Sequence, residues 1–475
     1  MIVKMSGILR AAVLFVGVPL AAAQGGGDTP LRVTRLGEKA ILVSDGALGQ
    51  QVAVNAKKGL IIFDSLWCPR VAKRFRERIE TEFGRKDVTL VVLTHGRLDL
   101  TGGGSVYPDA RILALRECGE VLARQKGRID LYLKPLVDMW RLKEESARRR
   151  MSESAPGSDG ERRERAWMAF CRGMADDLSE GYELILPTTT FTERLSIDLG
   201  DMTLLLVDAG AAARGTPGLV ARIPEIGLVV FGKFLFHDQH LLPYLNTHPW
   251  QDLGIARLLA VLDGILAEEG TITNLVVSSG PWPLAEIKAR RRYLGELWAA
   301  AEMAAKQGTG LEPLQRELRL EGRFAWLTDL PVWKNQGADW VREEHEANVA
   351  RVWGQFQRFP AREILEACRA SGTDAAVRTY RKLQEGKDPK LIFDEASLHS
   401  LVEILFLNGY LEAADAVSGL NVASFPGSWR VHDRRGQMCL ANGRPGEALT
   451  AYRKSLELDP SNENARAMIR QLAAP

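Results

Sequence analysis

The chain begins with short apolar runs that alternate with helical patterns and ends in a long region that is helical throughout. Between Leu31 and about Asp64, the β-type runs AILVSD, QVAVNA and GLIIFDS are separated by turn residues. The helical pattern RVAKRFRERIETEF and the fully apolar run VTLVVLTH follow, and ARILAL and CGEVLARQ repeat this order. Nearly all-apolar strands that alternate with helices predict a sheet covered by helices.

The middle of the chain predicts a helical insertion and a second set of strands. Residues 120–182 are charged and helical, and Ser152 to Glu161 are rich in serine and glycine, so we expect a mobile loop there. Strands resume in ERLSIDLGDMTLLLVDAG and GLVARIPEIGLVVFGKFLF, with Gly200 and Asp201 at a predicted hairpin turn. A helix and the buried strand TNLVVSSG complete this part, and only helices are predicted after Pro283.

Internal repeats occupy the C-terminal part. The units NGYLEAADAV and NGRPGEALTAY place Gly409 and Gly443 thirty-four residues apart. The last unit, residues 429–460, resembles a tetratricopeptide repeat, because the small, aromatic and helix-ending residues of that family occur at Gly436, Gly443, Ala448, Tyr452 and Pro460. The two upstream units, SGTDAAVRTY and NGYLEAADAV, are degenerate, and helical hairpins without a binding function remain an alternative there.

The order of elements from Leu31 to about Trp282 resembles the metallo-β-lactamase superfamily, whose members are αββα sandwiches. Three segments carry the resemblance: KGLIIFDS, which ends near a structural aspartate at Asp64, then VVLTHGRLDLTGGG and ILPTTTFTERLSIDLGDMTLLLVDAG. We therefore predict an α/β fold, namely a metallo-β-lactamase-like αββα sandwich over residues 31–283. A helical extension (residues 284–365) and an all-α tetratricopeptide-like region (residues 366–475) should follow it.

The resemblance implies a metal loop that has lost most of its ligands. The family's loop reads His-x-His-x-Asp-His, so His95 matches the first ligand and Asp99 the aspartate, whereas Arg97 and Leu100 stand where histidines are expected. Three distant ligand positions have changed as well, to Gly215 in RGTPG, Lys233 in VVFGKFLF and Ser279 in VVSSGPW. Five of seven ligand positions are therefore lost.

A catalytic zinc site needs three protein donors, and a protonated arginine cannot be one of them. We therefore expect no catalytic residue and no metal cofactor. Two interpretations of the remaining side chains stay open. In one, Arg97 or Lys233 pairs with Asp99 and forms a plug without a ligand. In the other, a small anion such as a carboxylate or phosphate binds at His95, Arg97, Asp99 and Lys233.

The enzymatic alternative is a hydrolase of esters, lactones or amides with one zinc or iron ion. Such a reduced or relocated site would use His95 and Asp99 and would recruit His237 or His240. Loop histidines on the surface are the commoner outcome for those two.

Four other features have simpler interpretations. Gly102, Gly103 and Gly104 could cradle an anion, but we expect them to allow the sharp turn of the loop. The five cysteines include no CxxC pair, and Cys68 is expected to be an ordinary buried thiol. The basic run from Lys288 to Tyr293 is expected to be a solvated helix face. The tryptophans after residue 284 are expected to pack between helices.

The N-terminus predicts export. Lys4 and Arg10 precede an apolar run that ends in alanines at residues 21–23, which is typical of a signal peptide (residues 1–23), and a Gly-rich leader (residues 24–30) follows. Cleavage would leave 60 basic and 60 acidic residues, a balance that argues against a nucleic-acid partner. No later run is long enough for a membrane span. The sequence thus predicts a periplasmic or secreted pseudoenzyme, which acts as a scaffold or anion-binding module and binds a protein or peptide through its repeats.

Overall fold

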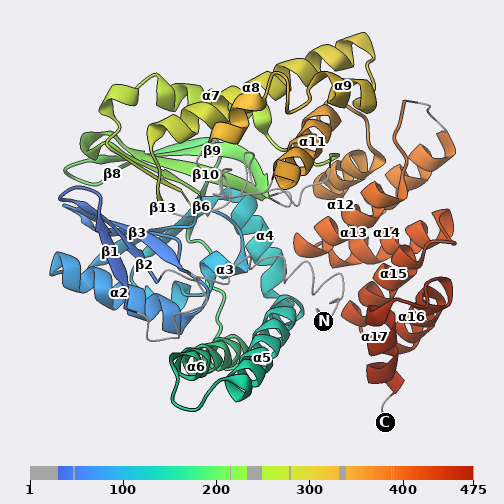
Figure 1. Cartoon of the computed structure of the whole chain (residues 1–475), viewed down its shortest axis with the longest axis horizontal. Helices are drawn as coiled ribbons and strands as arrows, with labels where there is room; N and C mark the ends of the chain where they lie inside the picture. The colour runs from blue at the N-terminus through green and yellow to red at the C-terminus, as the bar shows by residue number, and fades with distance from the viewer. Residues whose placement is uncertain are drawn as a thin grey trace.

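The computed structural model describes residues 30–45, 49–213, 216–232, 249–277, 280–330, 338–386, 388 and 390–473. Two sheets lie face to face, with helices on the outer side of each, and a helical region adjoins them (Figure 1). The predicted αββα layer order, followed by an all-α region, is confirmed. Within the described ranges, no helix is both long and apolar enough to cross a membrane.

The first sheet has its strands in chain order, from β1 to β7. β1 to β4 form antiparallel pairs, whereas β4 to β7 are parallel. Parallel neighbours need crossover connections, and helices provide them here. The strands are Arg32–Arg35, Ala40–Ser44, Gln50–Ala56, Gly59–Phe63, Val88–Val92, Arg111–Leu115 and Thr189–Phe191. The connecting helices include α2 (Pro69–Phe83), α3 (Leu98–Thr101) and α4 (Arg116–Lys126).

The second sheet has the order β13-β12-β11-β10-β9-β8. Its strands are, from β8 to β13, Arg194–Asp198, Thr203–Ala213, Thr216–Ile223, Leu228–Phe231, Asn274–Val277 and Gly280–Pro281. The hairpin predicted between β8 and β9 is confirmed, since Gly200 has the positive φ of 93° that suits glycine in a tight turn. Helices α7 (Ile255–Leu266) and α8 (Leu284–Gln307) cover the outer face.

The run from Lys288 to Tyr293 on α8 is only partly solvated, so this prediction was wrong for Arg290 and Tyr293, which are both buried. Arg290 is fully buried, with its guanidinium 3.9 Å from the centre of the Trp282 ring and bonded to the Glu286 carboxylate at 2.5 Å. A cation can be buried where a carboxylate and an aromatic face replace water.

The insertion is a pair of antiparallel helices, α5 (Ile129–Glu153) and α6 (Asp159–Glu180). A tight turn joins them, and the Ser158 hydroxyl caps α6 by accepting a hydrogen bond from the Glu161 amide. The aromatic rings of Trp140, Trp167 and Phe170 pack between the two helices.

The C-terminal region is a succession of helices. They are α9 (Leu311–Glu317), α11 (Ala338–Gly354), α12 (Pro360–Gly386), α13 (Glu395–Leu407), α14 (Leu411–Ser424), α15 (Trp429–Ala441), α16 (Pro445–Leu458) and α17 (Glu463–Ala473). Helix α12 is kinked at Ser371 and Gly372. In the last repeat, a Cβ atom on Gly436 would lie 2.7 Å from the Tyr452 ring, which explains why that position is glycine.

Candidate functional site

The predicted metal loop follows strand β5 and is anchored on Asp64. The Asp64 carboxylate accepts hydrogen bonds from the Thr94 amide (2.7 Å) and from the Thr94 hydroxyl (2.9 Å). Asp64 has a φ of 63°, which is uncommon for a residue with a side chain and persists only where surrounding contacts hold it. This aspartate therefore fixes the start of the loop, in agreement with the structural role that the resemblance implied.

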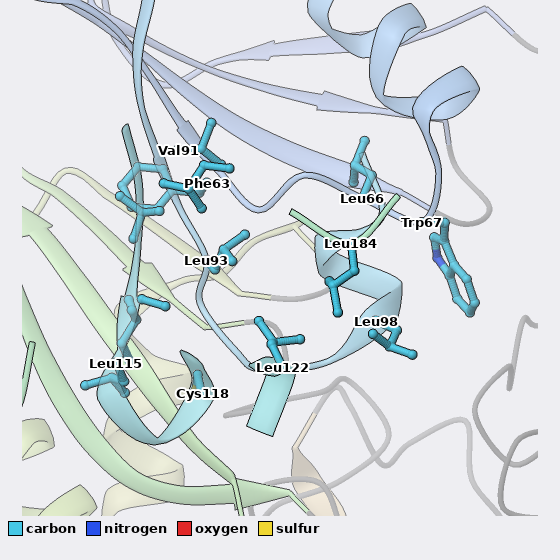
Figure 2. Close-up of a cluster of buried hydrophobic side chains, with 14 of the residues drawn as sticks. Phe63, Leu66, Trp67, Val91, Leu93, Leu98, Leu115, Cys118, Leu122 and Leu184 are labelled. Atoms are coloured by element: carbon cyan, nitrogen blue, oxygen red, sulfur yellow. The ribbon is translucent and has the colours of Figure 1, made fainter. Parts of the chain in front are cut away.

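Leu100, which stands where a histidine ligand is expected, belongs to the core. Its exposed fraction is 0%, and its carbonyl oxygen accepts hydrogen bonds from the Ser65 amide (2.8 Å) and hydroxyl (3.0 Å). Around the loop, Leu93, Leu98, Leu122 and Leu184 belong to one buried apolar cluster (Figure 2). The loop is thus fixed by backbone bonds and apolar packing.

The glycines after the loop are required by a close approach to another backbone segment. A Cβ atom on Gly102 would lie 2.0 Å from the Trp67 carbonyl oxygen, and one on Gly103 would lie 2.1 Å from the Ser65 carbonyl oxygen. Their amides both donate to the carbonyl oxygen of Leu66, at 3.0 and 3.3 Å. These two amides are therefore engaged within the protein, so for Gly102 and Gly103 the expectation that the glycines allow the sharp turn of the loop is confirmed.

The predicted ligand-binding residues fall partly within the described chain. His95 is buried with an exposed fraction of 1%, Arg97 is half-buried at the start of α3, and Asp99 is the second residue of α3. The other predicted positions lie outside the described residues: Gly215, Lys233, His237, His240 and Ser279.

The described residues beside those positions do converge on the loop. A Cβ atom on Gly232, the residue before Lys233, would lie 3.1 Å from the Thr94 carbonyl oxygen. Pro217 accepts a hydrogen bond from the Cys118 thiol (3.3 Å), and Cys118 in turn lies against Gly96. The ends of two distant segments therefore meet at the loop.

A small cavity lies between the two sheets beside the loop. Its volume is about 30 Å³, and Gln50, Asp64 and Thr94 supply its polar groups, while the other lining residues are apolar: Val52, Phe63, Val230, Phe231, Val276 and Val277. One water needs about 10–15 Å³ by this measure, so the cavity has room for a water-sized group and not for an organic substrate.

The thiols near the site are not activated. Burial raises the pKa of Cys68 to about 12, and burial also raises that of Cys118. All five cysteines are free and buried, so the expectation for Cys68 is confirmed. A nucleophilic cysteine needs a lowered pKa, which neither residue has.

The described side chains do not fit a zinc site. Among them, no three histidine, cysteine, aspartate or glutamate residues come together in a group that could hold a metal ion. Arg97 and Leu100 offer no lone pair suited to zinc. We therefore derive no metal-dependent step for this loop.

The family model for the tetratricopeptide repeat matches residues 429–462. The last repeat is a tetratricopeptide repeat. The sandwich before it is metallo-β-lactamase-like in its layer order.

The chain is also similar to one curated protein and to several solved structures. It is 36% identical over 87 residues to the 2,4-dinitroanisole O-demethylase subunit alpha of Nocardioides sp. (strain JS1661); the match covers 18% of this chain and about a quarter (26%) of that protein. A metallo-beta-lactamase from Pontibacter korlensis aligns with a TM-score of 0.36 and 13% identity, over 56% of this chain and 99% of its own. The sec-alkylsulfatase Pisa1 from Pseudomonas sp. aligns with a TM-score of 0.40 and 11% identity, over 94% and 66%.

Sequence reasoning predicted helix α4 from the run CGEVLARQ but missed the contact that its Cys118 makes with the loop. Cys118 lies between the loop at Gly96 and the start of β10 at Pro217. Only the isolated glycine in the loop could have pointed to this contact, because close backbone approach is a common reason for such a glycine.

Proposed function

We propose that this chain is an exported, non-hydrolytic protein whose sandwich binds a small anion at the former metal loop and whose repeats bind a protein or peptide. The burial of Leu100 carries the proposal. The Leu100 side chain has no exposed surface, and its carbonyl oxygen accepts two hydrogen bonds from Ser65. The loop is thus fixed with a fully buried apolar side chain at a position where a metal ligand is expected. The loop therefore supports a role other than zinc-dependent hydrolysis.

The charge of the loop supports an anionic ligand. Arg97 remains protonated at any physiological pH and offers a planar set of donors that suits carboxylate or phosphate. Lys233, which follows Gly232 beside Thr94, would add a second cation, and His95 and Asp99 complete the proposed set.

Thermal stabilisation by inorganic phosphate at constant ionic strength tests the anion site. The melting temperature of the wild-type protein should rise with phosphate concentration, and Lys233→Ala should abolish the rise. Lys73→Ala, which removes an exposed lysine of α2, is the matched control and should respond like the wild type. An unchanged response of Lys233→Ala would overturn the proposed anion site.

Metal analysis of protein purified without chelators tests the non-hydrolytic assignment. We expect only trace zinc and iron. A content of about one ion per chain, lost in His95→Ala, would show a metal site with fewer ligands and would contradict the pseudoenzyme proposal.

The second candidate is a metal-dependent hydrolase that uses His95 and Asp99 with His237 or His240. The similarity to a subunit named as a 2,4-dinitroanisole O-demethylase favours it over a limited part of the chain. In such a reaction water adds to the aryl ether, and 2,4-dinitrophenol and methanol are released. Release of the yellow phenolate from 2,4-dinitroanisole, absent in His95→Ala, would establish this candidate.

The proposal of a protein partner is based on the tetratricopeptide match, and the proposal of export is based on the N-terminal sequence. The tetratricopeptide match supports a protein or peptide partner. Export predicts a mature chain that begins after Ala23 in the periplasm or the medium, which N-terminal sequencing of the protein from its own cells would test.

A further inference from the structure

Helix α4 is in close contact at both ends with glycines of other segments. A Cβ atom on Gly96 of the loop would lie 3.0 Å from the Cα atom of Cys118, in the first turn of α4. A Cβ atom on Gly409, between α13 and α14, would lie 2.5 Å from the Cβ atom of Arg124, near the other end of α4. A methyl group at Gly409 would overlap Arg124, and one at Gly96 would be closer to Cys118 than an ordinary van der Waals contact.

At its first turn, α4 is bonded to a second segment of the candidate site. The Cys118 thiol donates to the carbonyl oxygen of Pro217 at 3.3 Å, which joins α4 to the beginning of β10. The loop at Gly96 and the strand at Pro217 thus both contact one buried residue, Cys118.

At its last turn, α4 caps the end of α13. Arg124 Nε donates to the Asn408 carbonyl oxygen (2.8 Å), and Gln125 Nε2 donates to that of Leu407 (2.6 Å). The last carbonyl groups of a helix have no partner within the helix and carry a partial negative charge, so a guanidinium group there is favourable. The Arg124 guanidinium also lies 4.3 Å from the centre of the Tyr410 ring.

The capping continues into the next repeat. Arg128 Nη2 donates to the carbonyl oxygen of Ala441 at 2.8 Å, at the end of α15. Ala441 is thirty-four residues after Leu407, so it occupies the same repeat position as the carbonyl that Gln125 caps. The Tyr132 hydroxyl donates to the Phe406 carbonyl oxygen at 3.0 Å. Residues 124–132 therefore bind the C-terminal ends of α13 and α15, the first helices of two consecutive repeats.

We propose that α4 is a rigid strut that couples the loop at residues 94–101 to the tetratricopeptide-like repeats. At 1.5 Å per residue, its eleven residues span about 16 Å. Because both ends are in contact without slack, a shift of the loop must displace either the strut or the repeats. Linkage makes the coupling reciprocal, so a change at the repeats alters the loop to the same extent. This regulation goes beyond the proposed function and rests on the α4 contacts alone.

Hydrogen exchange of the full-length chain, followed by mass spectrometry, tests the forward direction. Gly96→Ala should increase exchange by about fivefold or more at residues 404–410 and 438–443. Gly127→Ala is the matched control, because Gly127 follows α4 directly and a Cβ atom there meets nothing within 4 Å. Changes that stay within residues 90–126 would overturn the proposal.

A substitution near the C-terminal end of α4 tests the reverse direction, from the repeats to the loop. Arg124→Met removes the cap on α13 and should accelerate exchange at residues 93–101, whereas Arg116→Met, at an exposed position of the same helix, should not. If Gly96→Ala does not fold, Cys118→Ala replaces it, since it removes the thiol that bonds the first turn of α4 to Pro217. An unchanged loop in Arg124→Met would contradict the coupling.

Discussion

Arg124 and Asn408 are joined by a hydrogen bond of 2.8 Å, although 284 residues of sequence separate them. The bond runs from a side chain of the sandwich to a main-chain carbonyl of the repeats. The acceptor is a main-chain carbonyl group. Its position depends on where α13 ends and not on the side chain of Asn408. The contact therefore depends on the exact length of α13.

Gly409 provides the first prediction. Gly409→Ala should destabilise the protein by about 1–3 kcal/mol more than Gly443→Ala. Both glycines have positive φ, 80° and 70°, so both substitutions carry a similar backbone cost of about 1–2 kcal/mol. Only Gly409 also has a neighbour, Arg124, within 2.5 Å of the added atom, whereas nothing lies within 4 Å at Gly443. Urea denaturation followed by tryptophan fluorescence measures the difference, and equal losses would contradict it.

Leu100 provides the second prediction. Leu100→Ala should lower the free energy of unfolding by about 2–5 kcal/mol, as expected for a fully buried leucine whose removal leaves a cavity. Leu142→Ala is the control, because that side chain is 43% exposed on α5 and should change stability by about 0.5 kcal/mol or less. A neutral Leu100→Ala would mean that the loop does not depend on this side chain.

The sandwich could be predicted from the sequence because its strands are continuous apolar runs with clear turns between them. The candidate site could be located because a short loop after β5 keeps Thr94, His95 and the glycines together in sequence. The repeats were recognisable from small residues at a fixed period. These are local signals.

The contacts that the sequence did not predict are those between distant segments. The pattern of apolar and polar residues does not indicate that Arg124 caps α13, because the acceptor is a backbone carbonyl group. Arg290 belongs to a basic run and was expected in solvent, but Glu286 and Trp282 compensate its burial. Local sequence cannot show which member of a charged run has such neighbours.

The cysteines provide the third prediction. Burial raises the pKa of Cys171 to about 12 and that of Cys368 to about 11, as it does for Cys68. At pH 8 these three thiols should therefore react with iodoacetamide at least about a hundredfold more slowly than a free thiol. Mass spectrometry should find no modified cysteine in the native protein and five after unfolding. Rapid labelling of one native thiol would contradict the predicted burial.

His345 provides the fourth prediction, which concerns pH. Its Nε2 lies 2.5 Å from the carbonyl oxygen of Leu318, which can only accept, so Nε2 carries a hydrogen, and Nδ1 then accepts from the Tyr293 hydroxyl at 2.9 Å. The neutral ring is thus satisfied at both nitrogens. Burial lowers the pKa of His345, although the nearby carboxylates of Glu346 and Glu321 oppose the shift.

A histidine whose pKa is lowered in the folded state stays neutral while the unfolded chain takes up a proton. The unfolded state then binds more protons below its own pKa of about 6.5, so stability falls as the pH drops below that value. His345→Gln removes the titration while keeping an amide that can donate to Leu318. We expect the wild type to lose more stability than His345→Gln between pH 7.5 and 5 in urea titrations. Parallel pH profiles would show that the ring is not held neutral in the folded chain.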